Sequence, residues 1–439
     1  MSLAVRLARL GGPDSRLAVT DGSRGLTVGE LLGSTFHITD DMARDGVALC
    51  LPTVLDFTRA IAALDGRVSK LLLLSPDLGR AEMQGLLQSA SITCLITDRP
   101  DLVDIGQPLE FATGSPLAPH DCETTWLMTT SGTTGTPKIV AHRLAGLVAT
   151  VKSTPRQTRA VWGLLYEPSR FAGLQVILQA LLGHGCLVAP HRTLPVAEQL
   201  GILADAGCTH LSGTPSLWRK LLLSPAFEKL SLHQITLGGE TADTRVLSSL
   251  ANVFPQARIT QIYASTESGV GFSSHDGKPG FPVTCLVQTL GQADFKIHDG
   301  ELWARTGHLE ALSAATDADG YFCTGDSVEV IDGRLLFRGR RDAVANVGGI
   351  KIRVEDVEAI VRENGHVFDC QVGLKPSPIL GTVLTLQVVA RNPDADHSQL
   401  RSDIGAWCRS RLPREACPVS TKIVASLDMN AAGKVWRRS

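Results

Sequence analysis

The most informative stretch of the chain is Thr129-Thr130-Ser131-Gly132-Thr133-Thr134-Gly135-Thr136-Pro137-Lys138. It follows the apolar residues 126–128 and precedes a strand-like run at 138–141. Hydroxyls, accessible backbone N–H groups and an ammonium all bind phosphate, and the glycines let the backbone approach a ligand closely. We therefore expect a polyphosphate site, with a flexible surface linker as the alternative. It is not a Walker loop, because Lys138 follows Pro137 and precedes neither Ser nor Thr.

Composition narrows the class of protein. The 439 residues exceed what one hydrophobic core usually supports, so two or more structural units are expected. Lys and Arg number 42 against 44 Asp and Glu, a balance that argues against capture of nucleic acid or of an anionic membrane. The ten Cys form no C-x-x-C pair and the His show no zinc-ligand spacing, so reduced thiols and a cytoplasmic location are expected.

The N-terminus, residues 1–13, lacks the apolar centre of a secretory signal. The longest apolar stretch, residues 174–190, is interrupted by two Gln and a Gly-His-Gly turn, so it predicts a buried helix, a turn and a strand instead of a membrane span. We therefore expect a soluble protein.

Short apolar runs alternate with helical patterns along the first part of the chain, for example Val47–Leu51 and then Val54–Leu64. This alternation predicts an α/β fold with largely parallel strands. Beyond residue 290, short strands are separated by Asp-Gly dipeptides, which favour hairpins. A different unit follows Arg341, so we place domains at 1–341 and 342–439, the second a small α+β domain.

Further segments have side chains suited to nucleotide chemistry. In Tyr263-Ala264-Ser265-Thr266-Glu267 a ring can stack on adenine, a hydroxyl can hold phosphate and a carboxylate can hold Mg²⁺; the alternative is a polar turn after the strand-like residues 259–262. Gly238-Gly239-Glu240 ends a strand, where backbone atoms could line an adenine pocket; the alternative is a plain glycine turn. Asp326 could clamp ribose hydroxyls, or sit in a solvated hairpin. Lys434, close to the C-terminus, would by itself be read as part of a solvated tail.

These segments, in this order, resemble the motifs of the adenylate-forming ligases, the superfamily of acyl-CoA synthetases, peptide-synthetase adenylation domains and luciferases. The resemblance rests on residues 129–138, 238–240, 263–267, 320–326, 337–342, 346–358 and 430–437, and more weakly on 26–31 and 45–52. It implies a large layered αβ domain with a small β-barrel-like subdomain, followed by a small mobile α+β domain.

The resemblance also implies roles for individual residues. The phosphate ligands would be Thr130, Ser131, Gly132, Thr133, Thr134, Gly135 and Lys138. Thr266 would hold the α-phosphate and Glu267 the Mg²⁺, as catalytic residues together with Lys434. The adenosine part would be bound by Gly239, Glu240, Tyr263, Ala264, Ser265, Asp326 and Arg340. Asp342 would be the hinge, and Gly348 and Gly349 would face a thiol tunnel.

The implied reaction activates a carboxylic acid with MgATP to an acyl-adenylate and pyrophosphate, after which a thiol displaces AMP. The Lys434 cation would stabilise charge on the transferring phosphate. Rotation about Asp342 would then withdraw Lys434 and present the Gly348-Gly349 loop to a pantetheine arm.

The acid and the thiol are less well defined by the sequence. Arg170, Phe171, Gly173, Gly238 and Gly269 are the candidates for the acyl pocket, in which Arg170 could pair with a polar substituent or simply face solvent at a helix start. We expect a small aromatic or short acyl acid, and not an α-amino acid. The thiol is expected to be CoA or, second, a separate carrier protein. A non-catalytic nucleotide-binding relative, a kinase and an ATPase are the competing classes.

Overall fold

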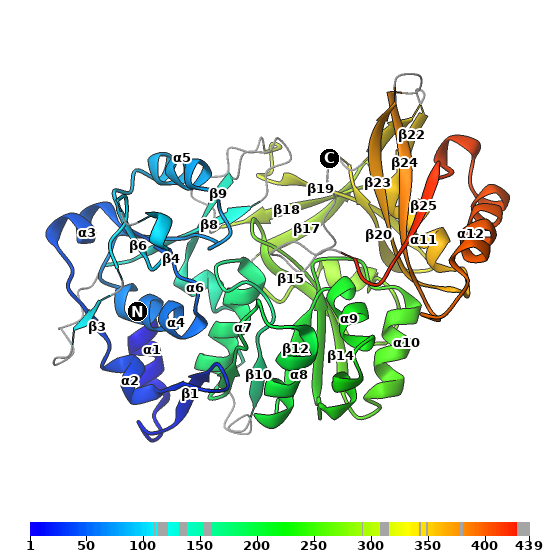
Figure 1. Cartoon of the computed structure of the whole chain (residues 1–439). Coiled ribbons are helices and arrows are strands. Elements are labelled where there is room, and N and C mark those ends of the chain that lie inside the picture. Colours follow the sequence, from blue (N-terminus) through cyan, green and yellow to red (C-terminus); the bar gives the residue numbers. More distant parts are fainter. Residues whose placement is uncertain are drawn as a thin grey trace. The chain divides into compact units, whose positions relative to one another are not determined.

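The computed structural model describes residues 1–102, 104–108, 110–112, 122–130, 138–152, 160–291, 293–307, 316–341, 344–347, 350–377 and 381–427. Contacts within the chain divide it into two compact units, each described here by itself (Figure 1). The first contains Met1–Pro279, Thr284–Phe295 and Arg305–Tyr321, and the second contains Gly280–Val283, Lys296–Ala304 and Phe322–Ser439. The predicted α/β class is confirmed, whereas the domain boundary at 341/342 stays a prediction.

The first unit contains a five-stranded sheet of order β6-β4-β5-β8-β9. Its strands are β4 (Val47–Cys50), β5 (Lys70–Leu73), β6 (Cys94–Thr97), β8 (Thr125–Thr130) and β9 (Lys138–Arg143). β9 pairs antiparallel with β8, and the other neighbours are parallel. All four residues of β4 are buried, as expected for a parallel strand covered on both faces.

Successive side chains of each strand point to opposite faces of this sheet, and apolar residues occur on both faces. Helices therefore cover both faces. Val47 and Leu71 join an apolar cluster with Phe57, while Ala48 and Leu72 join another with Met83. The surrounding elements are α3 (Asp40–Asp45), α4 (Val54–Leu64), α5 (Arg80–Ala90), α6 (Leu144–Leu147), the 3-10 helix η1 (Pro100–Leu102) and the strand pair β3 (Thr35–Phe36) and β7 (Phe111–Ala112).

An eight-stranded sheet of order β15-β14-β13-β12-β10-β11-β1-β2 forms the rest of this unit. Its strands are β1 (Leu17–Thr20), β2 (Gly25–Thr27), β10 (Val161–Gly163), β11 (Cys186–Val188), β12 (His210–Gly213), β13 (Gln234–Gly238), β14 (Arg258–Ser265) and β15 (Gly269–Ser274). The two edge strands, β2 and β15, run antiparallel and the strands between them are parallel. The parallel strands therefore end at a common edge, where ligands bind in such folds.

Several helical segments of the described residues accompany this sheet. They are α1 (Leu3–Leu10), α2 (Val28–Leu32), α7 (Phe171–Leu182), α8 (Val196–Asp205), α9 (Pro215–Leu222), α10 (Thr244–Val253) and the 3-10 helix η3 (Pro225–Lys229). The predicted buried helix, turn and strand over residues 174–190 are confirmed by α7 and β11, with His184 in the left-handed region at φ +62°.

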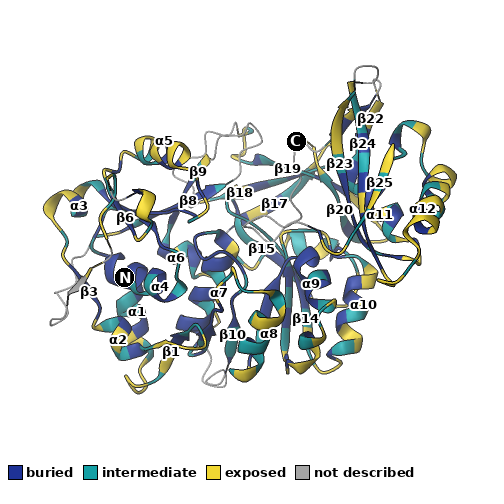
Figure 2. Ribbon diagram, in the orientation of Figure 1, coloured by how far each residue is buried: buried dark blue, intermediate teal, exposed yellow. Residues whose placement is uncertain are grey.

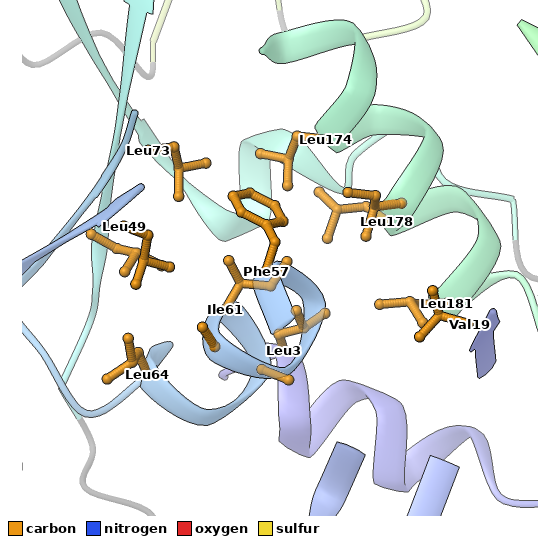
Figure 3. Close-up of a cluster of buried hydrophobic side chains, with 14 of the residues drawn as sticks. Leu3, Val19, Leu49, Phe57, Ile61, Leu64, Leu73, Leu174, Leu178 and Leu181 are labelled. Carbon is orange, nitrogen blue, oxygen red and sulfur yellow. The ribbon is translucent and has the colours of Figure 1, made fainter. Parts of the chain in front are cut away.

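The main core of the first unit packs α4 against α7 and α1. Figure 3 shows Phe57 and Ile61 of α4 beside Leu174 and Leu178 of α7, with Leu3 of α1 below them. All five side chains are at most 1% exposed. Burial of each contributes about 1.5–3 kcal/mol, so this cluster holds together helices that connect strands of both sheets. Figure 2 shows the same burial along the inner strands.

The second unit contains most of a further five-stranded sheet, of order β16-β20-β19-β18-β17. Its strands are β16 (Phe281–Pro282), β17 (Ala293–His298), β18 (Glu301–Thr306), β19 (Phe322–Ile331) and β20 (Arg334–Arg340), and the 3-10 helix η4 (Val283–Leu286) follows β16. The predicted hairpin turns are confirmed at Asp299-Gly300 and Asp332-Gly333, where all four residues have positive φ. Closure of this sheet into a barrel stays a prediction.

The C-terminal part of the second unit is α+β, as predicted. Helices α11 (Val354–Arg362) and α12 (His397–Arg411) accompany β23 (Val367–Ser377), β24 (Gly381–Ala390) and β25 (Ser420–Val424), and the remaining elements are β21 (Val344–Val347), β22 (Ile350–Arg353) and the 3-10 helix η5 (Arg414–Ala416). Apolar side chains of both helices and of these strands form one cluster, which gives this part a core of its own.

A buried carboxylate joins three elements of the first unit. Asp65 follows α4 and is 5% exposed. Its Oδ2 accepts from the Leu3 N–H at 2.6 Å, and its Oδ1 accepts from the Trp126 Nε1–H at 2.8 Å. Burial raises the pKa of Asp65 from 3.8 to about 6, in spite of these two hydrogen bonds.

We predict that the destabilisation caused by Asp65→Asn depends on pH. Asn can accept only one of the two donors, so the variant should be less stable than the parent. Between pH 3.8 and about 6 the folded parent holds a proton that the unfolded chain has lost, so the parent loses stability as the pH rises. The difference in unfolding free energy should therefore shrink by roughly 2–3 kcal/mol from pH 4 to pH 7.

Urea unfolding of both proteins across this pH range measures the effect, with exposed Asp14→Asn as the control. A difference between parent and Asp65→Asn that is the same at every pH would show that Asp65 titrates normally.

Candidate active site

The hydroxyl-rich segment joins the two strands of a hairpin. β8 ends at Thr130 and β9 begins at Lys138, and these residues are partners in the antiparallel ladder. Thr130 is half-buried and Lys138 is exposed. The hairpin therefore brings the two ends of the predicted phosphate loop to one place at the carboxyl edge of β8. The predicted ligands between them lie outside the described residues: Ser131, Gly132, Thr133, Thr134 and Gly135.

The Arg170 side chain reaches the base of this loop. Its Nη1 donates to the Thr129 carbonyl at 2.9 Å and lies 3.2 Å from the Thr129 Oγ1. Its Nε lies 3.3 Å from the Glu167 Oε2, and that carboxylate is 1% exposed. The Glu167 Oε1 accepts from the Ser169 N–H at 3.0 Å and from its hydroxyl at 2.6 Å. The Arg170 hydrogen bond to Thr129 thus connects the start of α7 to the end of β8, and the ion pair with Glu167 holds the same guanidinium.

The Gly238-Gly239-Glu240 segment lies at the carboxyl end of β13. Gly238 is the last residue of the strand and is paired with Ile262 of β14. Gly239 has φ +79°, a conformation that residues with a side chain rarely adopt. The Glu240 Oε2 then accepts from the Ser216 N–H at 3.0 Å, in the first turn of α9. The chain therefore turns sharply here, at the edge where ligands are expected.

Tyr263 lies within β14, on an aromatic platform. Its ring stacks on Phe272 with centroids 4.9 Å apart and meets Phe295 edge-on at 5.7 Å. The turn suggested directly after residues 259–262 is wrong, because pairing with β15 extends β14 to Ser265. A Cβ on Gly271 would lie 2.7 Å from the Phe295 ring, so glycine is needed beside these rings. Ala264 and Ser265 follow a bulge in the ladder.

Thr266 and Glu267 occupy the turn between β14 and β15. The Ser265 Oγ accepts from the Ser268 N–H at 2.9 Å and closes this turn, and Gly269 follows with φ +72°. In the described part of the chain, no hydrogen bond or ion pair involves the Glu267 carboxylate. That carboxylate is half-buried, so it is available to a cation or a ligand.

A small cavity of about 30 Å³ adjoins this turn. Its described lining consists of His142, Gly146, Thr150, Phe171, Gln175, Glu267, Ser268, Gly269, Val270, Gly291 and Thr306. Phe171 and Gly269 both line this cavity, and their assignment to an acyl pocket stays a prediction. Arg170, Gly173 and Gly238 are not among these lining residues.

Gly173 has a packing role instead. A Cβ there would lie 2.2 Å from the Glu167 carbonyl oxygen, so α7 begins in direct contact with the backbone of the preceding loop. Three polar lining residues, His142, Thr150 and Gln175, were not predicted from the sequence. His142 is buried in β9, two residues after buried Val140, so the two-residue alternation that follows Lys138 was the available signal.

Asp326 and Arg340 are neighbours in the second unit. They are paired across β19 and β20, and the Arg340 Nη1 lies 3.5 Å from the Asp326 Oδ1. The Thr324 hydroxyl donates to the Leu302 carbonyl at 2.7 Å and accepts from the Asp326 N–H at 3.2 Å, which fixes the backbone at Asp326. The Asp326 side chain is 18% exposed. A carboxylate and a guanidinium are therefore presented side by side.

The other predicted residues of this part of the chain, Asp342, Gly348, Gly349 and Lys434, lie outside the described residues. β21 and β22 pair antiparallel up to Val347 and Ile350, the residues on either side of the two glycines. Across the ranges that the structure describes, no three His, Cys, Asp or Glu side chains are grouped as metal ligands. No helix in those ranges is long and apolar enough to cross a membrane.

Comparisons with known proteins agree with this geometry. A family model described as AMP-binding enzyme matches residues 42–307. A Mycobacterium tuberculosis 3-[(3aS,4S,7aS)-7a-methyl-1,5-dioxo-octahydro-1H-inden-4-yl]propanoyl:CoA ligase is 29% identical over 74% of this chain and 67% of its own length. The 2-succinylbenzoate–CoA ligase of Bacillus licheniformis is 24% identical over 97% of this chain and 96% of its own length.

A solved structure shares the fold. The crystal structure of the anthranilate CoA ligase AuaEII in complex with anthranoyl-AMP superposes with a TM-score of 0.78, covering 99% of this chain and 95% of that one at 16% identity. The family model covers more than half of the chain. The chain therefore belongs to the AMP-binding enzyme family, and so to the adenylate-forming acid–thiol ligases that its sequence motifs predicted.

Proposed function

We propose that the protein activates a small carboxylic acid with MgATP to an acyl-adenylate and transfers the acyl group to CoA. The observation that supports this proposal most is that two consecutive residues at the start of α7 contact two different candidate sites. Arg170 contacts the base of the phosphate loop, and Phe171 lines the cavity that Glu267 also lines. A triphosphate on the loop and an acid in the cavity would thus meet within one unit.

The nucleotide would be held by groups of different chemistry. The hydroxyl-rich loop, from Thr130 to Lys138, would bind the β- and γ-phosphates, and Thr266 the α-phosphate. Tyr263, with one ring face already stacked on Phe272, would present an aromatic surface to adenine near Gly239. Asp326 and Arg340 would bind the ribose.

Glu267 fits the role of a magnesium ligand. Its carboxylate has no partner among the described residues, and Mg²⁺ in nucleotide sites is commonly held by one or two carboxylates together with phosphate oxygens. When bound, the ion would neutralise charge on the phosphates. Thr266, one residue earlier in the same turn, would orient the α-phosphate toward the acid, whose carboxylate attacks it and expels pyrophosphate.

The cavity supports a small acid. Its volume of about 30 Å³ leaves little space beyond the reacting carboxylate unless side chains move. Phe171 and Val270 offer apolar contact, while His142 and Gln175 offer polar groups. The described lining contains no carboxylate besides Glu267, so nothing there favours an α-amino group. The relatives named for 2-succinylbenzoate and anthranilate act on aromatic acids, which supports an aromatic or short acyl acid.

The acceptor is proposed to be CoA, because the curated relatives compared above are CoA ligases by name. The phosphopantetheine of a separate carrier protein is the second candidate. In either case the Gly348-Gly349 loop would face the thiol after rotation about Asp342, and the location would be cytoplasmic.

Pyrophosphate release tests this function. Incubation with MgATP, hydroxylamine and a panel of aryl, acyl and amino acids should release pyrophosphate with some small acids, and added CoA should give a thioester detectable by mass spectrometry. Glu267→Gln, which keeps the size and removes the charge, should lower kcat by about 10²-fold. ADP formation would identify a kinase or ATPase, and nucleotide binding without turnover a non-catalytic relative.

Lys434→Ala should separate the two half-reactions. Without the ammonium, charge on the transferring phosphate is not stabilised, so pyrophosphate release should fall by about 10²-fold or more. Thioester formation from supplied acyl-adenylate should stay within a few-fold of the parent. An equal loss in both half-reactions would contradict two separate conformations.

Filling the cavity should change acid selectivity. Thr150→Leu adds bulk at the cavity wall, so kcat/KM for the larger accepted acids should fall about tenfold while the KM for ATP stays constant. Ile202→Phe is the matched control, because Ile202 lines a separate cavity of about 410 Å³. If Ile202→Phe changed the acid profile and Thr150→Leu did not, the acid would bind in the larger cavity.

A further inference from the structure

Arg170 occupies the N-cap position of α7, yet its side chain makes no capping hydrogen bond. The guanidinium instead donates to the backbone carbonyl of Thr129, 41 residues earlier in the chain. The parallel ladder between β5 and β8 ends at Leu73 and Met128, one residue before Thr129. Arg170 therefore holds β8 just beyond the point where β5 stops supporting it.

The partner of Arg170 is itself fixed. The Glu167 Oε1 accepts hydrogen bonds from the backbone N–H and the hydroxyl of Ser169, and Oε2 forms an ion pair with Arg170 Nε at 3.3 Å without a hydrogen bond. A buried carboxylate is strongly destabilising unless it is paired, so separation of Glu167 from Arg170 is disfavoured. The absence of a side chain at Gly173 lets the Glu167 backbone pack directly on α7, because a Cβ there would lie 2.2 Å from the Glu167 carbonyl oxygen. The guanidinium is thus anchored from its own side.

These contacts disfavour a role for Arg170 as a ligand for the acid. The guanidinium already faces a carboxylate and a carbonyl oxygen, and it does not line the cavity beside Glu267. The guanidinium instead fixes the position of the Thr129 carbonyl. The next residue, Thr130, is where the phosphate loop begins. A shift of about 1 Å in such a positioning contact can cost about 10²-fold in rate.

We propose that Arg170, held by buried Glu167, is a positioning residue for the triphosphate: it fixes the end of β8 so that the loop starting at Thr130 can bind the β- and γ-phosphates. This inference rests on the proposed function, since it assumes that the loop binds ATP. It predicts that Arg170 affects ATP and has little effect on AMP, which lacks both phosphates.

Titration calorimetry on the full chain, without any acid, tests the proposal. Arg170→Gln should weaken MgATP binding about tenfold and leave AMP binding within twofold of the parent. Arg170→Lys can reach the Thr129 carbonyl but cannot also bridge to Glu167. Its affinity for MgATP should therefore lie between those of the parent and Arg170→Gln. Arg143→Gln is the matched control: it breaks an Arg–Glu pair, Arg143 to Glu123 at 3.1 Å, at the opposite end of the same hairpin. It should bind both nucleotides as the parent does.

Other outcomes would overturn the proposal. Equal weakening of ATP and AMP in both Arg170 variants would indicate a structural role, and thermal unfolding of each variant would show it directly. A raised KM for the acid with unchanged ATP affinity would make Arg170 an acid ligand. If the parent bound MgATP but released no pyrophosphate with any acid, the proposed function would fail while the ATP and AMP affinities still decided the role of Arg170. A parent that bound no MgATP would refute both.

Discussion

The contact between the Arg170 guanidinium and the Thr129 carbonyl joins the two sheets of the first unit where nucleotide chemistry is proposed. Thr129 belongs to the five-stranded sheet, and Arg170 follows a strand of the eight-stranded sheet. The apolar core around Phe57 and Leu174 connects the same sheets but has no directional requirement (Figure 3). The Arg170 hydrogen bond does, because a hydrogen bond weakens steeply when its distance or angle departs from the ideal. The core therefore stabilises the pairing of the sheets, and the hydrogen bond from Arg170 to Thr129 fixes their contact at the loop.

Strand pairing explains the distribution of the other functional groups along the chain. Parallel strands end at a common edge, so segments distant in sequence, such as Gly238-Gly239 and Thr266-Glu267, lie at the ends of neighbouring strands. Glycines with positive φ at 239 and 269 let the chain turn there without strain. The second unit supplies a different pair of groups, Asp326 and Arg340, whose spacing is set by an antiparallel ladder. Each unit thus orders its own contribution through strand pairing.

Elements that depend on neighbouring residues in the chain could be predicted from the sequence. Helix α4 was predicted at its observed bounds, and in the structure the Thr53 side chain caps its first turn. The hairpin turns were likewise predicted from their Asp-Gly dipeptides, which tolerate the positive φ that such turns require. Tertiary effects were not: Tyr263 extends β14 because it pairs with Phe272, and the Arg170 contact spans 41 residues. The lining residues His142 and Gln175 come from β9 and α7, and no local pattern connects those two elements.

The central claim is that the carboxylate of the acid attacks the α-phosphate of ATP. Turnover of an accepted acid labelled with ¹⁸O in its carboxylate, in the presence of CoA, tests this most directly by mass spectrometry of the nucleotide product. The account predicts AMP containing one ¹⁸O atom for each thioester formed. Unlabelled AMP, or label found in phosphate beside ADP, would contradict it.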